Sequence, residues 1–209
     1  VLAAEGRIVL RQRVRTPQGN YAETIEAVAK LVEACEASSG AAATVGIGIP
    51  GAISPASGLV KNANSTWLIG RPLADDLARR IGRPVRLAND ANCFALSEAT
   101  DGAAAGLKVV FGVILGTGVG GGLVVGGRVL TGANAIAGEW GHNPLPWPDP
   151  NELPGPPCYC GLTGCIETWL SGPGFARDHA QATGSALDAA QIVAAAVRGD
   201  AQCAASLAR

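Results

Sequence analysis

The chain has no methionine, 4% aromatic residues and charged side chains at only 16% of its 209 positions. Its 16 lysines and arginines are balanced by 17 aspartates and glutamates, so it lacks the excess of positive charge that binds nucleic acid or an anionic membrane. No apolar run reaches the roughly 18 residues that a membrane-spanning helix needs. The composition therefore predicts a globular chain with a substantial core, and neither a nucleic-acid-binding nor a membrane protein.

The first residues show no signal peptide, and we expect a cytoplasmic protein. Residues 1–16 (VLAAEGRIVLRQRVRT) are typical of a strand, a turn at Glu5-Gly6 and a second strand. Because the chain opens inside a predicted hairpin and has no methionine, we expect it to be a fragment of a longer protein.

The order of the predicted elements indicates an α/β protein with two domains. Asn20 is a predicted cap for a helix that ends before Gly40, and a short buried strand follows at 44–49. A helix at about 73–81, a strand at 85–88 and a helix from Asn89-Asp90 to about 105 complete the first domain, residues 1–106. The second domain, residues 107–209, is predicted to contain an apolar strand at 109–115, a glycine segment, another strand, a proline-rich loop at 144–157 and a helical end.

The glycine segment Gly116-Thr-Gly-Val-Gly-Gly-Gly122 formally contains the pattern G-x-G-x-x-G. In a dinucleotide-binding fold a helix follows these glycines, whereas here the apolar residues 123–125 predict a strand, and there is no Gly-Lys-Ser/Thr ending of a P-loop. A turn with so little side chain can present several backbone N–H groups to phosphate oxygens. A tight hairpin that needs glycine only for its backbone conformation is the alternative.

Asp90 follows a predicted strand and opens a predicted helix. A helix N-terminus favours the ionised carboxylate, and ligands of α/β sheets bind outside the carboxyl ends of the strands. An ionised aspartate at this position can accept the proton of a substrate hydroxyl during phosphoryl transfer. A helix cap without a catalytic role is an equally good interpretation of Asp90 alone.

Three of the six cysteines, Cys158, Cys160 and Cys165, lie within eight residues and cannot all pair with one another. With His142 as a fourth ligand they form a Cys3His set, which is typical of structural zinc. Disulfides or free thiols remain the alternative, because C-x-C-x4-C is not the commonest zinc spacing. Glu139 and Glu167 flank these ligands and are candidates to bind a polyhydroxyl substrate, or else are solvated surface charges.

Taken together, four motifs resemble those of the ROK family of sugar kinases and repressors. They are Leu87-Ala-Asn-Asp-Ala-Asn92, Gly116 to Gly122, Gly138-Glu-Trp-Gly-His142 and Cys158-Tyr-Cys-Gly-Leu-Thr-Gly-Cys-Ile-Glu167. The stretches 60–67 and 142–147 are most similar to bacterial fructokinases of the manno(fructo)kinase type. The resemblance implies a two-domain, actin-like ATPase (ribonuclease H-like) fold that binds a sugar and ATP between its domains.

The resemblance also implies a role for each motif residue. Asp90 would be the base that acts on the sugar hydroxyl, and His142 would both contact the sugar and bind zinc with Cys158, Cys160 and Cys165. The sugar shell would comprise Gly51, Asn64, Asn89, Asp90, Glu139, His142 and Glu167, and the ATP phosphates would contact Gly116, Thr117 and Gly118.

The expected activity is phosphorylation of a hexose, with fructose favoured, by ATP and Mg²⁺ in a homodimer that carries structural Zn²⁺. A kinase for another hexose or an N-acetylhexosamine, a sugar-responsive ROK repressor and a remnant that only binds sugar are the alternatives. The family's N-terminal D-x-G-G-T phosphate loop and its C-terminal adenosine segment have no match in this sequence. We therefore expect residues 1–209 alone to bind ATP weakly and to show little activity.

Overall fold

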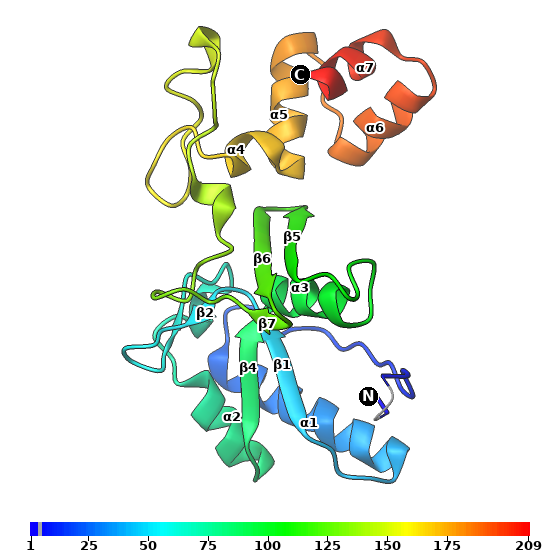
Figure 1. Ribbon diagram of the computed structural model, residues 1–209, viewed down its shortest axis with the longest axis vertical. Coiled ribbons are helices and arrows are strands. Elements are labelled where there is room, and N and C mark those ends of the chain that lie inside the picture. The colour runs from blue at the N-terminus through cyan, green and yellow to red at the C-terminus, as the bar shows by residue number, and fades with distance from the viewer. Residues whose placement is uncertain (4–5) are drawn as a thin grey trace. The chain divides into compact units, whose positions relative to one another are not determined.

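The computed structural model describes residues 1–3 and 6–209, and these divide into two compact units (Figure 1). Unit 1 comprises residues 1–93 and 132–136, and unit 2 comprises residues 94–131 and 137–209. In unit 1, Lys61 Nζ donates to the carbonyl of Asn134 at 2.5 Å, which attaches the short segment 132–136 to the main part of that unit. The predicted division between residues 106 and 107 stays a prediction.

Unit 1 is built on two parallel strands, β1 (Val45–Ile49) and β4 (Val85–Asn89), with helices α1 (Tyr21–Ser39) and α2 (Leu73–Ile81). The register pairs Ile49 with Asn89, so the two strands end at the same level. The buried core consists of Ile25, Ile49, Val60, Ala63, Leu68, Leu73 and Leu77. Strand β1 was expected to be buried, but Gly46 and Gly48 are exposed because only one face of the strand pair meets this core.

The helix boundaries of unit 1 follow from local signals. The Asn20 side chain accepts the N–H of Glu23, and Gly40 follows α1 in the left-handed conformation with φ 71°, which confirms the predicted cap and the predicted end of the helix. Helix α2 has Asp75 and Asp76 in its first turn and Arg79 and Arg80 in its last turn, as the helix dipole favours. Its bounds are those predicted from the sequence.

The remaining elements of unit 1 are short. Strands β2 (Ala52–Ile53) and β3 (Val60–Lys61) form a small antiparallel pair, and η1 (Thr66–Leu68) is one turn of 3₁₀ helix. Of the predicted N-terminal hairpin, the described residues contain an isolated antiparallel bridge between Leu2 and Ile8. Residue 5 of the predicted turn lies outside the described residues, and residues 9–16 form no strand.

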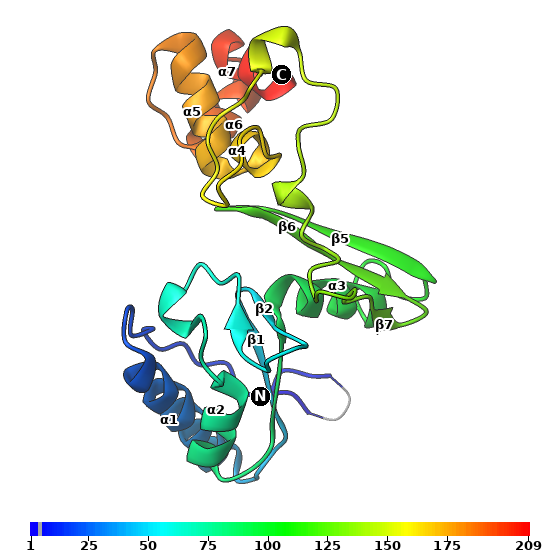
Figure 2. The same ribbon diagram turned by 90° about the vertical axis from the view of Figure 1, so that its left-hand side faces the viewer.

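Helix α3 (Asp90–Thr100) begins in unit 1 and continues into unit 2, and it is shorter than the predicted helix to about residue 105. Unit 2 contains an antiparallel sheet in the order β5 (Val109–Leu115), β6 (Val119–Val125) and β7 (Arg128–Val129) (Figure 2). Gly126 and Gly127 form the tight turn before β7 with φ 57° and 74°. Ala95 of α3 packs with Val110 and Val124 in a small core.

The second strand of this sheet begins earlier than predicted. Gly120, Gly121 and Gly122 lie within β6, where they pair with Ile114, Val113 and Gly112, so the turn itself comprises only 116–118. Their lack of side chain allows another backbone to approach. A Cβ atom at Gly138 would lie 2.1 Å from the Gly121 carbonyl oxygen, and one at Gly141 would lie 2.1 Å from that of Val119.

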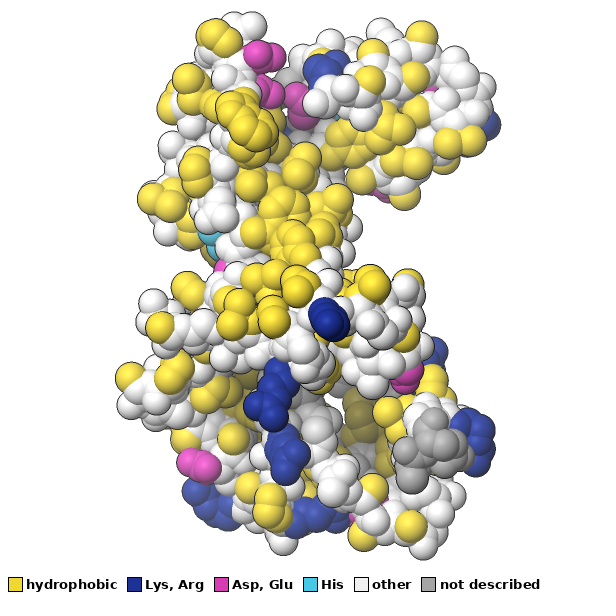
Figure 3. Space-filling view, in the orientation of Figure 1, with side chains coloured by type: hydrophobic (Ala, Val, Ile, Leu, Met, Phe, Trp, Pro, Cys, Tyr) yellow, Lys and Arg dark blue, Asp and Glu magenta, His cyan; other side chains and the backbone are white. Residues whose placement is uncertain are grey.

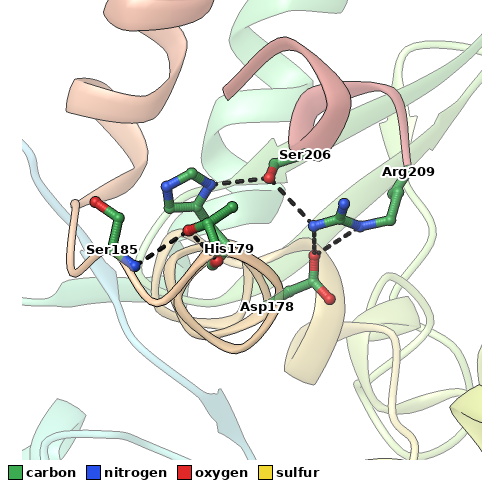
Figure 4. A network of polar contacts seen from close by, with 6 residues as sticks. Asp178, His179, Ser185, Ser206 and Arg209 are labelled. Carbon is green, nitrogen blue, oxygen red and sulfur yellow. Dashed lines mark hydrogen bonds and ion pairs between the residues drawn. The ribbon is translucent and has the colours of Figure 1, made fainter. Parts of the chain in front are cut away.

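The C-terminal part of unit 2 is helical, as predicted. It contains α4 (Glu167–Leu170), α5 (Gly172–Thr183), α6 (Ala189–Val197) and α7 (Ala201–Ala208), while η2 (Trp140–His142) and η3 (Pro150–Glu152) lie before them. Polar contacts join α5 to the C-terminal end of the chain (Figure 4). The buried His179 ring contacts Ser206 at 2.8 Å, and Arg209 donates to both Ser206 and Asp178.

Part of the apolar surface of unit 2 lies on its sheet. Hydrophobic side chains gather around β5 and β6 (Figure 3), and Val109, Phe111, Val113 and Leu115 of β5 are each 43 to 64% exposed. Among the described residues, no helix combines the length and the hydrophobicity needed to cross a membrane.

Candidate functional site

The carboxyl end of β4 places two predicted site residues, Asn89 and Asp90, at the start of α3. The Asn89 side chain caps the helix, because its Oδ1 accepts the Asn92 N–H at 3.0 Å, and its Nδ2 donates to the Gly51 carbonyl at 2.9 Å. Asp90 Oδ1 accepts the N–H of Ala91 at 2.8 Å. The side-chain bond to the N–H three residues later, which is typical of a helix cap, is therefore made by Asn89 and not by Asp90.

Gly51 lies just after β1, at the level where β4 ends. Its φ is +76°, and a Cβ atom there would lie 2.4 Å from the Lys61 carbonyl oxygen. Glycine is therefore required at this position for both conformation and space. The Asn89 bond to its carbonyl brings two predicted sugar-shell residues together in unit 1. Asn64 is exposed, and it accepts hydrogen bonds from its own neighbours, Ser65 and Thr66.

The four predicted metal ligands converge in unit 2. The donor atoms of His142, Cys158, Cys160 and Cys165 all lie within 4.8 Å of one another. Cys160 Sγ is 3.7 Å from Cys165 Sγ, and Cys158 Sγ is 3.5 Å from His142 Nδ1. Ligands on a tetrahedron around zinc are separated by about 3.5 to 3.8 Å, given bonds of about 2.0 to 2.3 Å. The donor set and its spacing therefore fit Zn²⁺, and all six cysteines are free thiols rather than disulfides.

The surroundings of these thiols differ. Burial raises the pKa of the Cys165 thiol to about 12, because the thiolate would lose its hydration. The pKa of the Cys160 thiol is lowered, chiefly by the backbone N–H of Leu162, which stabilises a thiolate. A cation bound among the four side chains would favour the thiolate form of each cysteine.

Tyr159 is a participant that the sequence argument missed. Its Oη lies 3.0 Å from His142 Nε2, and the two rings meet edge to face with centroids 5.1 Å apart. His142 Nδ1 is the ring nitrogen near Cys158. An oxygen partner on one imidazole nitrogen commonly orients the other nitrogen toward a metal. In the sequence, the only sign of this role is that Tyr159 stands between two of the predicted cysteine ligands.

The segment that carries Glu139 and His142 is anchored on β6. Trp140 Nε1 donates to the Gly120 carbonyl at 2.7 Å, and its ring packs edge to face on Phe111 at a centroid distance of 6.0 Å. With Gly138 and Gly141 in close approach to the same strand, three contacts fix η2. Trp140 is thus a positioning residue that the motif alone did not identify.

Glu167 opens α4 and reaches the glycine turn rather than solvent alone. Its Oε2 accepts the Val119 N–H at 2.8 Å. Gly116 and Gly118 form the turn with Thr117 between them, and the Gly116 N–H donates to the Gly118 carbonyl at 2.9 Å. One predicted sugar ligand and the predicted phosphate turn are therefore in direct contact within unit 2.

A cavity of about 1090 Å³ lies beside this turn in unit 2. Gly116 and Thr117 are among the residues that line it, and apolar side chains from α4, α5 and α6 supply much of its wall. These include Trp169, Phe175 and Val193. A cavity of about this size with a mostly apolar wall is typical of a site for a small molecule.

Comparison with known proteins identifies these motifs as parts of one family. The sequence profile of the ROK family matches residues 1–209, the whole chain. The chain belongs to the ROK family. An N-acetyl-D-glucosamine kinase of Pectobacterium atrosepticum is 43% identical over 197 residues, which are 92% of this chain and 65% of that protein.

Two solved ROK structures agree with the fold described above. A ROK hexokinase from Thermus thermophilus has a TM-score of 0.77 and 34% identity, over 92% of this chain and 63% of the other. A ROK glucokinase from Streptomyces griseus, solved with glucose and AMPPNP, has a TM-score of 0.74 and 31% identity, over 98% of this chain and 69% of the other. The predicted actin-like α/β fold class is confirmed. This ROK chain spans about two thirds of the length of its relatives.

Proposed function

We propose that the protein transfers the γ-phosphoryl group of ATP to a hydroxyl of an amino sugar, N-acetyl-D-glucosamine. The 43% identity to a kinase named for that sugar supports this choice. The fructose preference expected from two short stretches has no support among these relatives, so N-acetyl-D-glucosamine replaces fructose in the proposal.

The observation that carries the proposal is the placement of Asp90 at the carboxyl end of β4, at the N-terminus of α3. Its Oδ1 accepts a backbone N–H, and the carboxylate is assigned as the base for the sugar hydroxyl. As the proton moves to Asp90, the hydroxyl oxygen forms the new bond to phosphorus and the bond to the ADP oxygen breaks.

Asn89 and Gly51 serve the sugar by presenting polar groups at the same strand end. Each polar atom of the Asn89 amide makes one bond in the structure, and an amide has a second N–H and a second lone pair to offer a hydroxyl. We assign Asn64, Glu139, His142 and Glu167 to the same sugar shell, as the family motifs imply. Hydrogen bonds of this kind discriminate strongly between sugars that differ in one group.

The nucleotide is assigned to unit 2. The turn Gly116, Thr117 and Gly118 is proposed to hold its phosphates, chiefly through the N–H groups of Thr117 and Gly118, because the Gly116 N–H already donates to the Gly118 carbonyl. The cavity that Gly116 and Thr117 line is proposed to take the adenosine. Magnesium bound with ATP would neutralise charge that develops on the transferred phosphoryl group.

His142, Cys158, Cys160 and Cys165 are proposed to hold zinc in a structural role. Four protein ligands close the coordination sphere, so such a site supplies rigidity rather than reactivity. The loop between Cys158 and Cys165 leads directly into α4 and Glu167. A homodimer is likewise proposed, by family resemblance alone.

The test is ATP-dependent phosphorylation of N-acetyl-D-glucosamine, glucose, mannose and fructose by the complete protein and by its Asp90→Asn variant. We expect the highest kcat/KM with N-acetyl-D-glucosamine. Asparagine keeps the oxygen that accepts the Ala91 N–H but cannot take the proton, so turnover should fall by 10²-fold or more, on the order of a general base's contribution, while sugar binding measured by calorimetry persists. Retained turnover in the variant would show that another group is the base.

A further inference from the structure

Glu167 has a structural contact that a sugar ligand does not need. Its Oε2 accepts the backbone N–H of Val119, the first residue of β6, at 2.8 Å. The carboxylate also lies directly over Gly118, because a Cβ atom built there would be 2.7 Å from Oε2. The Glu167 carboxylate thus connects the start of α4 to the glycine turn.

A second bond holds the other side of the same turn. The N–H of Gly172, the first residue of α5, donates to the Gly116 carbonyl at 2.8 Å. The turn is therefore bonded to α4 through a side chain and to α5 through the backbone. Glycine loses more conformational freedom on ordering than any other residue, so a turn with two glycines needs such external bonds to keep one conformation.

We propose that Glu167 is a positioning residue for the phosphate turn, and that its bond to the Val119 N–H holds residues 116–118 in one conformation before nucleotide binds. This inference rests on the proposed function, in which that turn receives the phosphates of ATP. An ionised acceptor forms a stronger bond to N–H than a neutral one. In the proposed function, the other carboxylate oxygen, Oε1, accepts from the sugar hydroxyl.

Because Glu167 carries a negative charge, its positioning role can be distinguished from a direct attraction of the nucleotide. A carboxylate beside a phosphate site repels the ligand, so its value at this place lies in accepting the Val119 N–H. Glu167→Gln keeps an oxygen acceptor of the same reach and removes the charge, whereas Glu167→Ala removes the acceptor.

Exchange of the Val119 amide hydrogen, followed by NMR on the substrate-free protein, tests the bond itself. We expect about tenfold faster exchange in Glu167→Ala, corresponding to a loss of about 1.4 kcal/mol, and a smaller change in Glu167→Gln. Gly118→Ala should also speed exchange, because its Cβ displaces the carboxylate. Gly120→Ala is the matched control, since a Cβ there has no atom within 4 Å.

Wild-type exchange at Val119 in both Glu167→Ala and Gly118→Ala would overturn the proposal. If Glu167→Ala does not fold, the comparison of Val119 exchange between Gly118→Ala and its control Gly120→Ala tests the proposal instead. This measurement requires no substrate, so it is independent of whether the protein phosphorylates any sugar.

Kinetics then test the consequence for nucleotide. In Glu167→Ala the KM for ATP should rise severalfold, and Glu167→Gln should recover part of that loss. A rise in the KM for sugar with the KM for ATP unchanged would mean that Glu167 acts on the sugar alone, and the positioning role would be wrong. Absence of phosphorylation by the complete wild-type protein would refute the proposed function and leave the exchange result unchanged.

Discussion

At the scale of single residues, the glycines of unit 2 have two roles: some form a turn, and others allow two backbone segments to pack closely. Gly126 and Gly127 adopt positive φ in a turn, whereas Gly138 and Gly141 allow their segment to lie against β6 with no room for a Cβ. The second kind fixes Glu139 and His142, because both side chains belong to that segment. Close backbone packing is thus part of the candidate site.

We expect Gly141→Ala to destabilise the protein by about 1 to 3 kcal/mol, because its Cβ would overlap the Val119 carbonyl and force the strand or η2 to move. Urea unfolding measures this change. Gly120 follows Val119 in β6, and Gly120→Ala introduces the same methyl group into open space. This control should change the free energy of unfolding by less than about 1 kcal/mol. Equal effects of the two substitutions would contradict the close-packing explanation.

Asp76 provides a prediction about pH. The Tyr21 hydroxyl donates to its carboxylate at 2.7 Å, as does Arg79, and these bonds lower the pKa of Asp76 below its ordinary value of 3.8. Because the pKa is lower in the folded state, the stabilisation is complete above about pH 4 and is lost as pH falls through the folded pKa.

The free energy of unfolding should therefore differ between wild type and Asp76→Asn at pH 5 to 7, and the difference should shrink toward pH 3. Asp75→Asn removes a neighbouring carboxylate for which the described contacts show no hydrogen bond or ion pair, and it serves as the control. A constant difference across this range would show that the Tyr21 and Arg79 bonds do not depend on ionised Asp76.

At the scale of elements, α6 shows how one helix face contributes to the cavity. Val193 lines the cavity, whereas Val197, one turn later on the same helix, is 82% exposed and does not line it. The two positions therefore form a natural pair for testing what the cavity binds.

Val193→Trp should fill part of the cavity and raise the KM for ATP by tenfold or more, equivalent to about 1.4 kcal/mol of lost binding, with the KM for sugar little changed. Val197→Trp adds the same ring in solvent and should leave both values near wild type. Steady-state kinetics with each substrate varied in turn makes the comparison. If Val193→Trp leaves the KM for ATP unchanged, adenosine does not bind in this cavity.

At the scale of the whole molecule, each unit has its own buried cluster. Leu77 belongs to the cluster of unit 1 and is 1% exposed, while Ala95, Val110 and Val124 form a cluster in unit 2. No residue of one cluster is shared with the other among the described residues. A substitution in one core should therefore destabilise the unit that contains it before it affects the other unit.

Leu77→Ala should destabilise unit 1 by about 2 to 5 kcal/mol, since it removes a fully buried side chain and leaves a cavity. Hydrogen exchange measured by mass spectrometry should increase in α1, α2 and β4 and remain near wild type in β5 and β6. Leu107→Ala, at a 61% exposed position, is the control. An equal increase in both units would indicate that they unfold together.

Some elements could be predicted closely because their signals are local. The bounds of α2 at 73–81 and of β5 at 109–115 agree with the sequence prediction: charge placement and a following glycine define the helix, and a continuous apolar run defines the strand. Gly120 to Gly122 were misassigned to a turn because glycine has low strand propensity, and pairing with β5 overrides it.

The sequence by itself determined the α/β class, the family motifs and the four side chains that could hold a metal, because residue type and spacing carry that information along the chain. Only the tertiary structure decided that Asn89 caps α3, that Tyr159 faces His142 and that Glu167 bonds to the glycine turn. The last contact joins residues 48 positions apart. A hydrogen bond of this kind depends on which side chain and which amide the fold brings within 3 Å of each other, and spacing in the sequence does not specify that.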